Sequence, residues 1–270
     1  MASRPAHFTS QGDGIFAPTE FSRSRWGENM LNGPAVVGLA ACSLEQQYSD
    51  PDFLPARLTV DLFKAARGVP TTTRMRLVRD GHRVRNVECD VVQGDVTVAR
   101  ATLVQYRRSQ APPGQEWVGH ATFTPPPGAD GHSFYIGSDD AEWSPTGAHH
   151  QNTSRKRVYH RPIDVVAGID ATPFVRAVIV AEATSLVSNL GTRGIGYING
   201  DLTMALSRLP VGEFVGVQGD SHWCADGISV GSATLFDDDG PFGIGLVTAI
   251  ANPAAQIDFG GAEVMPTLRV

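Results

Sequence analysis

The second half of this chain repeats the first half in sequence. A segment that begins at Leu58 reads LTVDLFKAARG, and a segment that begins at Leu202 reads LTMALSRLPVG, at an offset of 144 residues (202 − 58). Further along, the pair Asp80-Gly81 matches Asp226-Gly227 at an offset of 146 residues (226 − 80). Insertions of this size are tolerated in the loops between strands. The duplication therefore predicts two similar halves that pair as an internal pseudo-dimer.

Each half is predicted to begin with one mostly apolar helix. Residues 34–47 are small and apolar, and they begin with a proline, which favours the first turn of a helix. Residues 173–189 form a similar stretch in the second half. Thr172 precedes it as a candidate N-cap, and Gly191 follows it as a candidate stop signal.

Antiparallel strands are predicted to follow each helix. Residues 57–108 alternate between apolar and polar side chains, which is typical of strands with one buried face. Hairpin turns are expected at residues 79–81 and 93–95 in the first half, and at residues 226–227 and 237–240 in the second. Such a sheet needs cover on its apolar face, and one long helix in each half supplies it.

The two repeats are predicted to be separated by a linker. Residues 111–160 are rich in proline, glycine, histidine and aspartate, which is unusual for a core element. This linker divides the chain into an N-terminal unit, residues 1–110, and a C-terminal unit, residues 161–270. Partial order is expected around three aromatic residues of the linker: Trp117, Phe134 and Trp143.

The composition indicates a globular protein of the cytoplasm. Of the 270 residues, 41% are hydrophobic and 19% are charged, which is enough apolar material for a large core. The net charge of −6 argues against a nucleic-acid partner, and no apolar run is long enough to span a membrane or to form a signal peptide. Three widely separated cysteines, Cys42, Cys89 and Cys224, have no metal-ligand spacing and suit a reducing compartment.

Several segments follow one another in a consistent order through both halves: PTEFSRSRW, NGPA, RLTVDLFKAARG with LVRDGHRV, YINGDLTMALSRLPVGEF and GISVGSATLFDDDGPFG. Together they resemble the double-hotdog acyl-CoA thioesterases of the acyl-CoA thioesterase II-like group. The resemblance implies an α+β fold of two tandem hotdog repeats, in each of which a twisted antiparallel sheet wraps a long helix. It also implies that the two sheets join into one.

The same resemblance implies the activity. Acyl-CoA would be hydrolysed to a fatty acid and CoA at the interface between the halves, by attack of water on the thioester, without a metal ion or an organic cofactor. The expected partner is the acyl-CoA substrate. A homo-oligomer is expected because hotdog sheets often pair further.

Asp201 is the first candidate for the catalytic group. The resemblance places the family's catalytic aspartate here, at the start of a strand in the segment NGDLT. Its first-half equivalent is Arg57 (201 − 144), so the acid is kept in only one copy. A carboxylate can orient and deprotonate the water that attacks a thioester carbonyl. The alternative is an aspartate that caps a turn or strand by accepting hydrogen bonds from nearby amides.

Two further positions of the family's site fall on less certain residues. The hydroxyl position aligns with Asp220 or Ser221 in QGDSHWCADG. Ser221 keeps a hydroxyl that can hold water, whereas Asp220 would place two carboxylates together and raise the pKa of one of them. The third position is a glutamine in the family, and Thr248 in GLVTAIA is the nearest polar residue here, without an amide donor.

Glu182 is a candidate because it lies within the apolar stretch VRAVIVAEATSLVSN. An unpaired buried carboxylate is costly, so this group is expected to be paired, protonated or next to a cleft. It is either a catalytic acid of the kind that many hotdog thioesterases carry on the helix, or one partner of an ion pair with Arg176 or Arg193. The thioester oxygen would need backbone N–H donors, for which the helix starts at Gly33-Pro34 and Thr172-Pro173 are the natural source.

Three other functions compete with hydrolysis. One is an acyl-CoA or acyl-carrier binding protein without turnover, which the missing glutamine favours. Another is an enoyl-CoA hydratase, but the D-x-N-P-x-H string that such an enzyme would carry does not occur. The third is a structural interaction module, against which the asymmetry between Asp201 and Arg57 argues.

Overall fold

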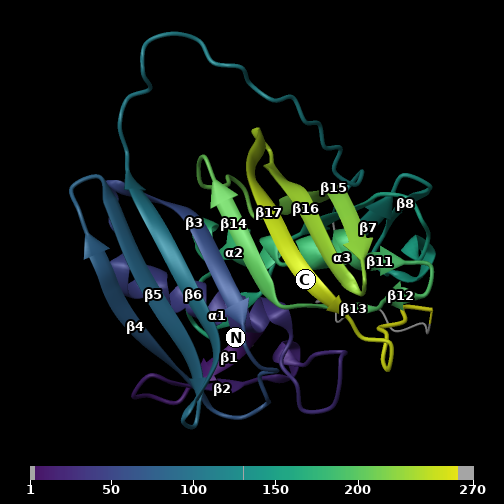
Figure 1. The fold of residues 1–270 in the computed structure, drawn as a ribbon, viewed down its shortest axis with the longest axis horizontal. Helices are drawn as coiled ribbons and strands as arrows, with labels where there is room; N and C mark the ends of the chain where they lie inside the picture. Colours follow the sequence, from purple (N-terminus) through teal and green to yellow (C-terminus); the bar gives the residue numbers. More distant parts are fainter. Residues whose placement is uncertain (1–3, 130, 261–270) are drawn as a thin grey trace.

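One continuous sheet runs through both halves of the molecule, and the helices lie behind it (Figure 1). The computed structural model describes residues 4–129 and 131–260. The helices are α1 (Gly33–Tyr48), α2 (Pro173–Ala181) and α3 (Thr184–Asn189), with short 3-10 turns η1 (Glu20–Ser22) and η2 (Ala148–His150). The strands of the first half are β1 (Ala6–Ser10), β2 (Ile15–Pro18), β3 (Phe53–Leu62), β4 (Thr71–Asp80), β5 (Val84–Gln93) and β6 (Val96–Arg107). Those that follow are β7 (Phe134–Ser138), β8 (Ala141–Ser144), β9 (Lys156–His160), β10 (Asp164–Val166), β11 (Leu190–Gly191), β12 (Gly194–Ile195), β13 (Tyr197–Asn199), β14 (Asp201–Leu206), β15 (Val215–Ala225), β16 (Ile228–Asp237) and β17 (Gly240–Ala251).

The halves join where β3 pairs with β14. The strand order through the large sheet is β10-β1-β2-β4-β5-β6-β3-β14-β17-β16-β15-β9-β7-β8, and β13 also pairs with β17. At the seam Thr59 lies opposite Thr203, Asp61 opposite Asp201 and Arg57 opposite Ala205. This register is symmetric about the threonine pair, as expected when the two strands come from equivalent repeats. The predicted continuous sheet is confirmed.

The first helix has the start that its sequence predicts. The Asn32 side chain caps α1 by accepting a hydrogen bond from the backbone N–H of Ala35 at 2.8 Å, and Pro34 stands in the first turn. Every residue from Ala35 to Leu44 is buried. A helix that is apolar on all sides must be surrounded, and α1 is accordingly enclosed between the sheet and α2.

The second helix is interrupted, contrary to the single helix predicted over residues 173–189. Between α2 and α3, the N–H of Ala183 bonds the carbonyl of Val180 and the N–H of Ser185 bonds that of Glu182, each at 3.0 Å. These are the tighter i to i+3 bonds of a 3-10 turn, which within a helix often mark a functional position. The interruption falls at Glu182.

Close packing accompanies this interruption. The buried Thr184 follows it directly, and a Cβ atom at Gly245 of β17 would come within 2.1 Å of the Thr184 hydroxyl oxygen. The helix therefore approaches the sheet at a point where the strand has no side chain.

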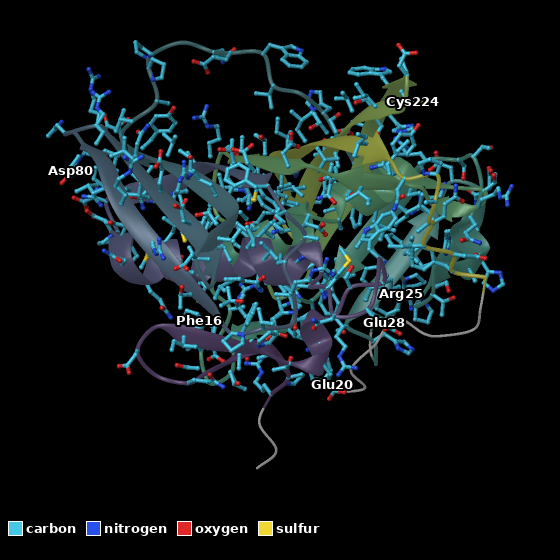
Figure 2. All side chains as sticks on the ribbon, turned by 60° about the horizontal axis from the view of Figure 1, so that its bottom comes forward. Phe16, Glu20, Arg25, Glu28, Asp80 and Cys224 are labelled. Carbon is cyan, nitrogen blue, oxygen red and sulfur yellow. The ribbon has the colours of Figure 1, made fainter. Side chains whose placement is uncertain are left out.

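The hairpin at Asp226-Gly227 is confirmed and connects β15 to β16 with two residues. Both adopt positive φ, 51° for Asp226 and 76° for Gly227, as a type I′ turn requires. The end of β15 at Cys224 and the end of β4 at Asp80 lie on opposite sides of the molecule (Figure 2). Cys224 is exposed there.

The segment between the repeats contains more regular structure than its composition indicates. Strands β7, β8 and β9 all fall within residues 111–160, and β9 extends the sheet by pairing with β15. Residues 108–122 are exposed, and the chain there arches from β6 above the ends of the central strands β14, β17 and β16 (Figure 1). Of the three expected anchors, Phe134 is buried and the Trp143 ring packs edge-on against Phe123, but Trp117 is 90% exposed.

No helix among the described residues is long and apolar enough to cross a membrane.

Candidate active site

Asp201 and Thr248 are in direct contact. The backbone N–H of Thr248 donates to Asp201 Oδ1 at 2.7 Å, and the Thr248 hydroxyl donates to Oδ2 at 2.5 Å. The N–H of Gly200 also bonds the Thr248 carbonyl at 2.9 Å. Three hydrogen bonds therefore fasten the start of β14 to β17 at this point.

This pair lies on the side of the sheet that faces away from the helices. Leu202 and Val247, the sequence neighbours whose side chains point the other way, are fully buried. Asp201 itself is partly exposed and stands opposite Asp61 at the seam. Its carboxylate oxygens are both engaged, as in the strand-capping alternative.

Ser221 and Asp220 lie elsewhere. In the strand order β14-β17-β16-β15 they are three strands from Asp201, roughly 14 Å at the usual spacing between strands. Ser221 shares a hydrogen bond of 2.7 Å with the hydroxyl of Ser232, and Asp220 accepts one of 2.8 Å from Thr234. The structure therefore does not bring these two residues to the Asp201–Thr248 pair.

Glu182 lies where the two halves meet. It is partly buried at the break between α2 and α3, and its Oε1 accepts a hydrogen bond from Asn199 Nδ2 at 3.4 Å. A Cβ atom at Gly33, the first residue of α1, would come within 2.0 Å of the same Oε1. Only glycine at the start of α1 allows the carboxyl to approach the helix backbone so closely.

The expected ion pair of Glu182 is not formed. The Arg176 guanidinium donates instead to the carbonyls of Ala171, at 2.7 Å, and Gly212, at 2.9 Å. Within residues 4–129 and 131–260, no basic side chain forms an ion pair with Glu182. The alternative that makes Glu182 a structural partner of Arg176 or Arg193 is therefore wrong.

The surroundings of Glu182 keep a proton on it in neutral solution. Burial raises the pKa of Glu182 to about 8, and the hydrogen bond from Asn199 acts weakly in the opposite direction. A group that titrates near neutral pH can take a proton and return it, which is the requirement for acid–base catalysis. The N-terminal turn of α1 beside it favours negative charge.

Asn199 connects Glu182 to the Asp201–Thr248 pair. It ends β13 two residues before Asp201, and Gly200 lies between them. The sequence reasoning missed Asn199, although it belongs to the same segment YINGDLT, because nothing in that segment shows that its amide reaches across to the helix. The hydrogen bonds at Thr248 fix the strand that presents this amide.

A second carboxyl stands at the start of the other helix. The Thr172 hydroxyl, which caps α2 by accepting from the N–H of Val175 at 3.2 Å, donates to Glu45 Oε2 of α1 at 2.5 Å. Burial raises the pKa of Glu45 as well. Each helix of the pair thus places an acid next to the first turn of the other. Sequence reasoning missed Glu45, since the pattern of α1 does not show which residue faces α2.

A cavity of about 620 Å³ lies beyond the C-terminal end of α3. Asp220, Ser221 and Tyr197 are among its lining residues, and Asp220 also lines a second cavity together with Gln218 and Trp143. Asn189 also lines it, is 6% exposed, and has an Nδ2 without a hydrogen-bond partner. Across the described parts of the chain, no group of three or more His, Cys, Asp or Glu side chains is arranged to hold a metal ion.

Comparison with known families accounts for nearly the whole described chain. Residues 22–106 match the model of the acyl-CoA thioesterase N-terminal domain, and residues 102–249 match the model of the acyl-CoA thioesterase C-terminal domain. No curated protein is similar enough in sequence to match.

Solved structures show the same fold at low sequence identity. An acyl-CoA thioesterase II from Mycobacterium marinum is 16% identical, with a TM-score of 0.63, over 93% of this chain and 97% of that one. A tesB protein from Mycobacterium avium subs paratuberculosis is 13% identical, with a TM-score of 0.66, over 91% and 96%. A hot dog-fold protein from Alicyclobacillus acidocaldarius is 12% identical, with a TM-score of 0.66, over 92% and 96%. The fold is therefore a hot dog fold.

Proposed function

This chain belongs to the acyl-CoA thioesterase family, and we propose that it cleaves the thioester of acyl-CoA at Glu182. The observation that carries the proposal is the place of this carboxyl. It has a pKa of about 8, stands against the first residue of α1, and lies at the contact between the two halves. Neither Asp201 nor Asp220 stands against the first residue of a helix.

The proposed reaction uses Glu182 as a general base. The ionised carboxyl takes a proton from water as the water oxygen bonds to the thioester carbonyl carbon. The carbon–sulfur bond then breaks, and Glu182 returns the proton to the CoA thiolate, so that a fatty acid and CoA leave. The carbonyl oxygen would meet the first turn of α1, where Pro34 has no N–H and Ala35 donates to Asn32, which leaves Gly33 as the donor.

Asp201 and Thr248 are positioning residues in this proposal. Their hydrogen bonds fix β13 and β14, and the strand in turn aims the Asn199 amide at Glu182. Asp201 as the base itself is the rival arrangement, with Thr248 holding the water. Ser221 and Asp220 would contact the substrate in the cavity beyond α3 and take no part in proton transfer.

The proposal includes a finer description of the protein. Its fold would be a double hotdog, with an N-terminal unit of residues 1–110, a linker of residues 111–160 and a C-terminal unit of residues 161–270. The repeated order of helix and strands and the symmetric seam support this division. We further propose a cytoplasmic protein that forms homo-oligomers, with acyl-CoA as its partner.

The test is the release of free thiol from acyl-CoA substrates of increasing chain length. Glu182→Gln keeps the size and the hydrogen bond of the side chain but cannot accept a proton, and it should lower kcat by about a hundredfold or more. Glu116→Gln, in the exposed segment, is the matched control and should leave kcat unchanged.

Other outcomes assign the base or the function differently. If Glu182→Gln retains turnover and Asp201→Asn loses it, Asp201 is the base. If the natural chain binds acyl-CoA saturably and releases no thiol, the protein binds acyl-CoA without hydrolysing it.

A further inference from the structure

The outer face of the sheet, which points away from the helices and towards the viewer in Figure 1, carries an apolar patch in the second half. Five side chains of β15, β16 and β17 form it: Trp223, Ile228, Ile244, Leu246 and Ile250. The alternate residues of β17, such as Val247 and Ala249, point towards the helices and are buried. The five patch residues are between 38% and 69% exposed, so the described part of the chain leaves them uncovered.

The same face of the first half is charged. Arg100 on β6 donates two hydrogen bonds to Asp90 on β5, at 2.6 and 3.0 Å, and stands opposite Asp61 on β3. Beside them, Arg76 on β4 forms an ion pair with Glu88 on β5. The first half therefore presents paired charges to water, as an ordinary solvated sheet face does.

The repeat relates these positions one to one. The offset of 144 residues carries Arg100 to Ile244 (244 − 100), and Arg100 stands opposite Asp61 and Asp90 on its two neighbouring strands. In the same way, Ile244 stands opposite two uncharged residues, which the same offset relates to that pair: Ala205 and Thr234. Each charge of the trio in the first half thus has an uncharged counterpart in the second.

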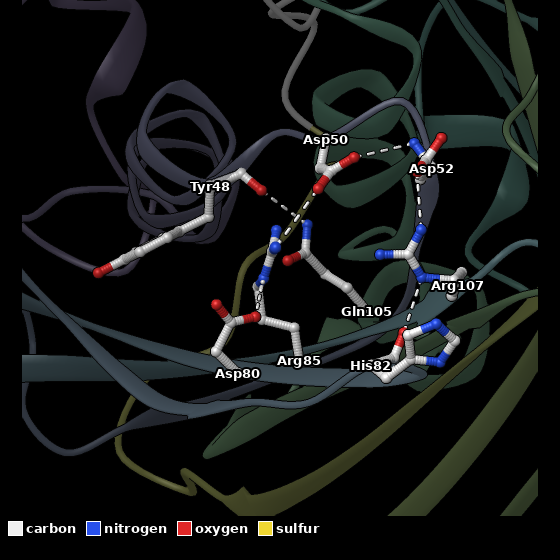
Figure 3. Close-up of polar contacts among 8 residues, drawn as sticks. All are labelled: Tyr48, Asp50, Asp52, Asp80, His82, Arg85, Gln105 and Arg107. Atoms are coloured by element: carbon white, nitrogen blue, oxygen red, sulfur yellow. Dashed lines mark hydrogen bonds and ion pairs between the residues drawn. The ribbon is translucent and has the colours of Figure 1, made fainter.

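The contrast in charge extends to the ends of these strands. In the first half, Arg85 donates to Asp80 at 3.0 Å, and Arg107 donates to Asp52 at 2.7 Å (Figure 3). The offset of 144 residues relates these two arginines to two uncharged residues: Ser229 and Ala251. One copy of the repeat is therefore suited to water, and the other is suited to contact with another surface.

The patch is large for a surface that stays in water. An exposed aliphatic side chain offers on the order of 100 Å² and a tryptophan somewhat more, so the five residues together offer roughly 500 Å². Apolar patches on monomers reach about 300–600 Å². The hydroxyl residues among them, Thr203, Ser232 and Thr234, extend the face towards the roughly 800 Å² that each partner contributes to a stable interface.

We propose that this patch is the contact surface of a homodimer, in which the second half of one copy lies face to face with the second half of another. A two-fold contact brings the patch against itself, and the patch has no charge that would repel its own copy. Two carboxylates border it, Asp201 and Asp220, and each accepts a hydrogen bond from a threonine of the same face. The charged face of the first half stays in water.

This proposal supplies a surface for the homo-oligomer proposed above. It does not depend on the reaction at Glu182, because that carboxyl lies on the helix side of the sheet.

The test is sedimentation velocity over a range of micromolar concentrations. The natural chain should sediment as a dimer. Ile244→Arg should sediment as a monomer, and the strand should tolerate it because the first half has Arg100 at the equivalent position. Leu77→Arg, at an exposed apolar residue of β4 in the first half, is the matched control and should remain a dimer. A monomeric natural chain, a dimer that survives Ile244→Arg, or a dimer that Leu77→Arg dissociates would overturn the proposal.

A second variant covers the case in which Ile244→Arg fails to fold. Ile250→Thr keeps a β-branched residue, which suits a strand, and removes apolar surface from the middle of the patch. The dissociation constant of the dimer should rise about tenfold. A dissociation constant within twofold of the natural value would show that the contact lies elsewhere.

Thiol release separates this proposal from that on Glu182. Ile244→Arg should release thiol at the natural rate per chain although it is monomeric. A natural chain that dimerises through the patch without releasing thiol would refute only the hydrolysis. A monomeric natural chain that releases thiol would refute only the interface.

Discussion

The two ends of the helix pair differ in how the acid meets the opposite helix. At one end the Glu182 carboxyl lies directly against the backbone of Gly33, and at the other the Glu45 carboxyl accepts from the Thr172 hydroxyl. The Thr172 side chain donates a hydrogen bond to the Glu45 carboxyl, whereas Gly33 has no side chain that could donate one to Glu182. The same scaffold therefore yields one carboxyl that the capping residue of the other helix holds, and one that lies against bare backbone and is held by Asn199 instead.

The largest effect should come from adding a side chain at Gly33. Gly33→Ala introduces a methyl group within 2.0 Å of Glu182 Oε1, so the carboxyl must move. Since alanine favours helix, α1 should persist. We expect kcat for thiol release to fall by about a hundredfold or more, with an unchanged circular dichroism spectrum. Gly119→Ala, in the exposed segment, is the control. If the kcat of Gly33→Ala stays within twofold of the natural value, the two ends of the helix pair do not differ in the way described.

The pH profile should show the next largest effect. If Glu182 must be ionised and its pKa is about 8, kcat/KM should rise about tenfold for each pH unit between pH 6 and 7.5 and level off above 8. Rates measured from pH 6 to 9 with a constant ionic strength test this. A plateau that begins near pH 5 would mean that Glu182 is not the base.

Removing the hydrogen bonds that fix the strand next to Asn199 should lower kcat by a smaller factor. Asp201→Ala removes both bonds to Thr248 but leaves Glu182 in place, so we expect kcat to fall by about tenfold while the apparent pKa in the pH profile stays with Glu182. Thr203→Ala, on the same face of β14, is the control. An Asp201→Ala loss as large as that of Glu182→Gln, together with a lost pH dependence, would make Asp201 the base.

The smallest effect is on stability. A carboxyl whose folded pKa is raised to about 8 stabilises the fold fully below its unfolded pKa of about 4.3, and this contribution is lost as the pH rises towards 8. Glu182→Gln has no such dependence. Its melting temperature should match that of the natural chain near pH 4 and exceed it by several degrees at pH 8. Parallel melting temperatures at all pH values would contradict the buried, protonated state.

Local patterns in the sequence predict much of the fold. Asn32 and Thr172 cap their helices as their residue types favour, and the Asp226-Gly227 turn forms as predicted. The interruption at Glu182 is not predictable in this way, because the apolar pattern continues through it and the cause is contact with the sheet. Strands β7 to β9 were not predicted, because the residues around them are rich in proline and glycine.

The candidate site shows where such reasoning stops. Asp201 and Thr248 were predicted together, and they are in contact. Gly33, Asn199 and Glu182 come from three separate segments, and only packing between the halves shows that they meet. Glu45, which meets Thr172 of the other half, was missed for the same reason.

The exposed arch of residues 108–122 tethers the two halves, which lowers the strength of pairing that β3 and β14 need in order to stay together. A tether of this kind holds its two ends at an effective concentration on the order of millimolar. Two separate subunits would have to overcome dilution to pair β3 with β14, whereas the halves of this chain are never far apart. A short strand pairing can therefore join them, and each repeat was free to change the residues that a symmetric dimer must keep in duplicate.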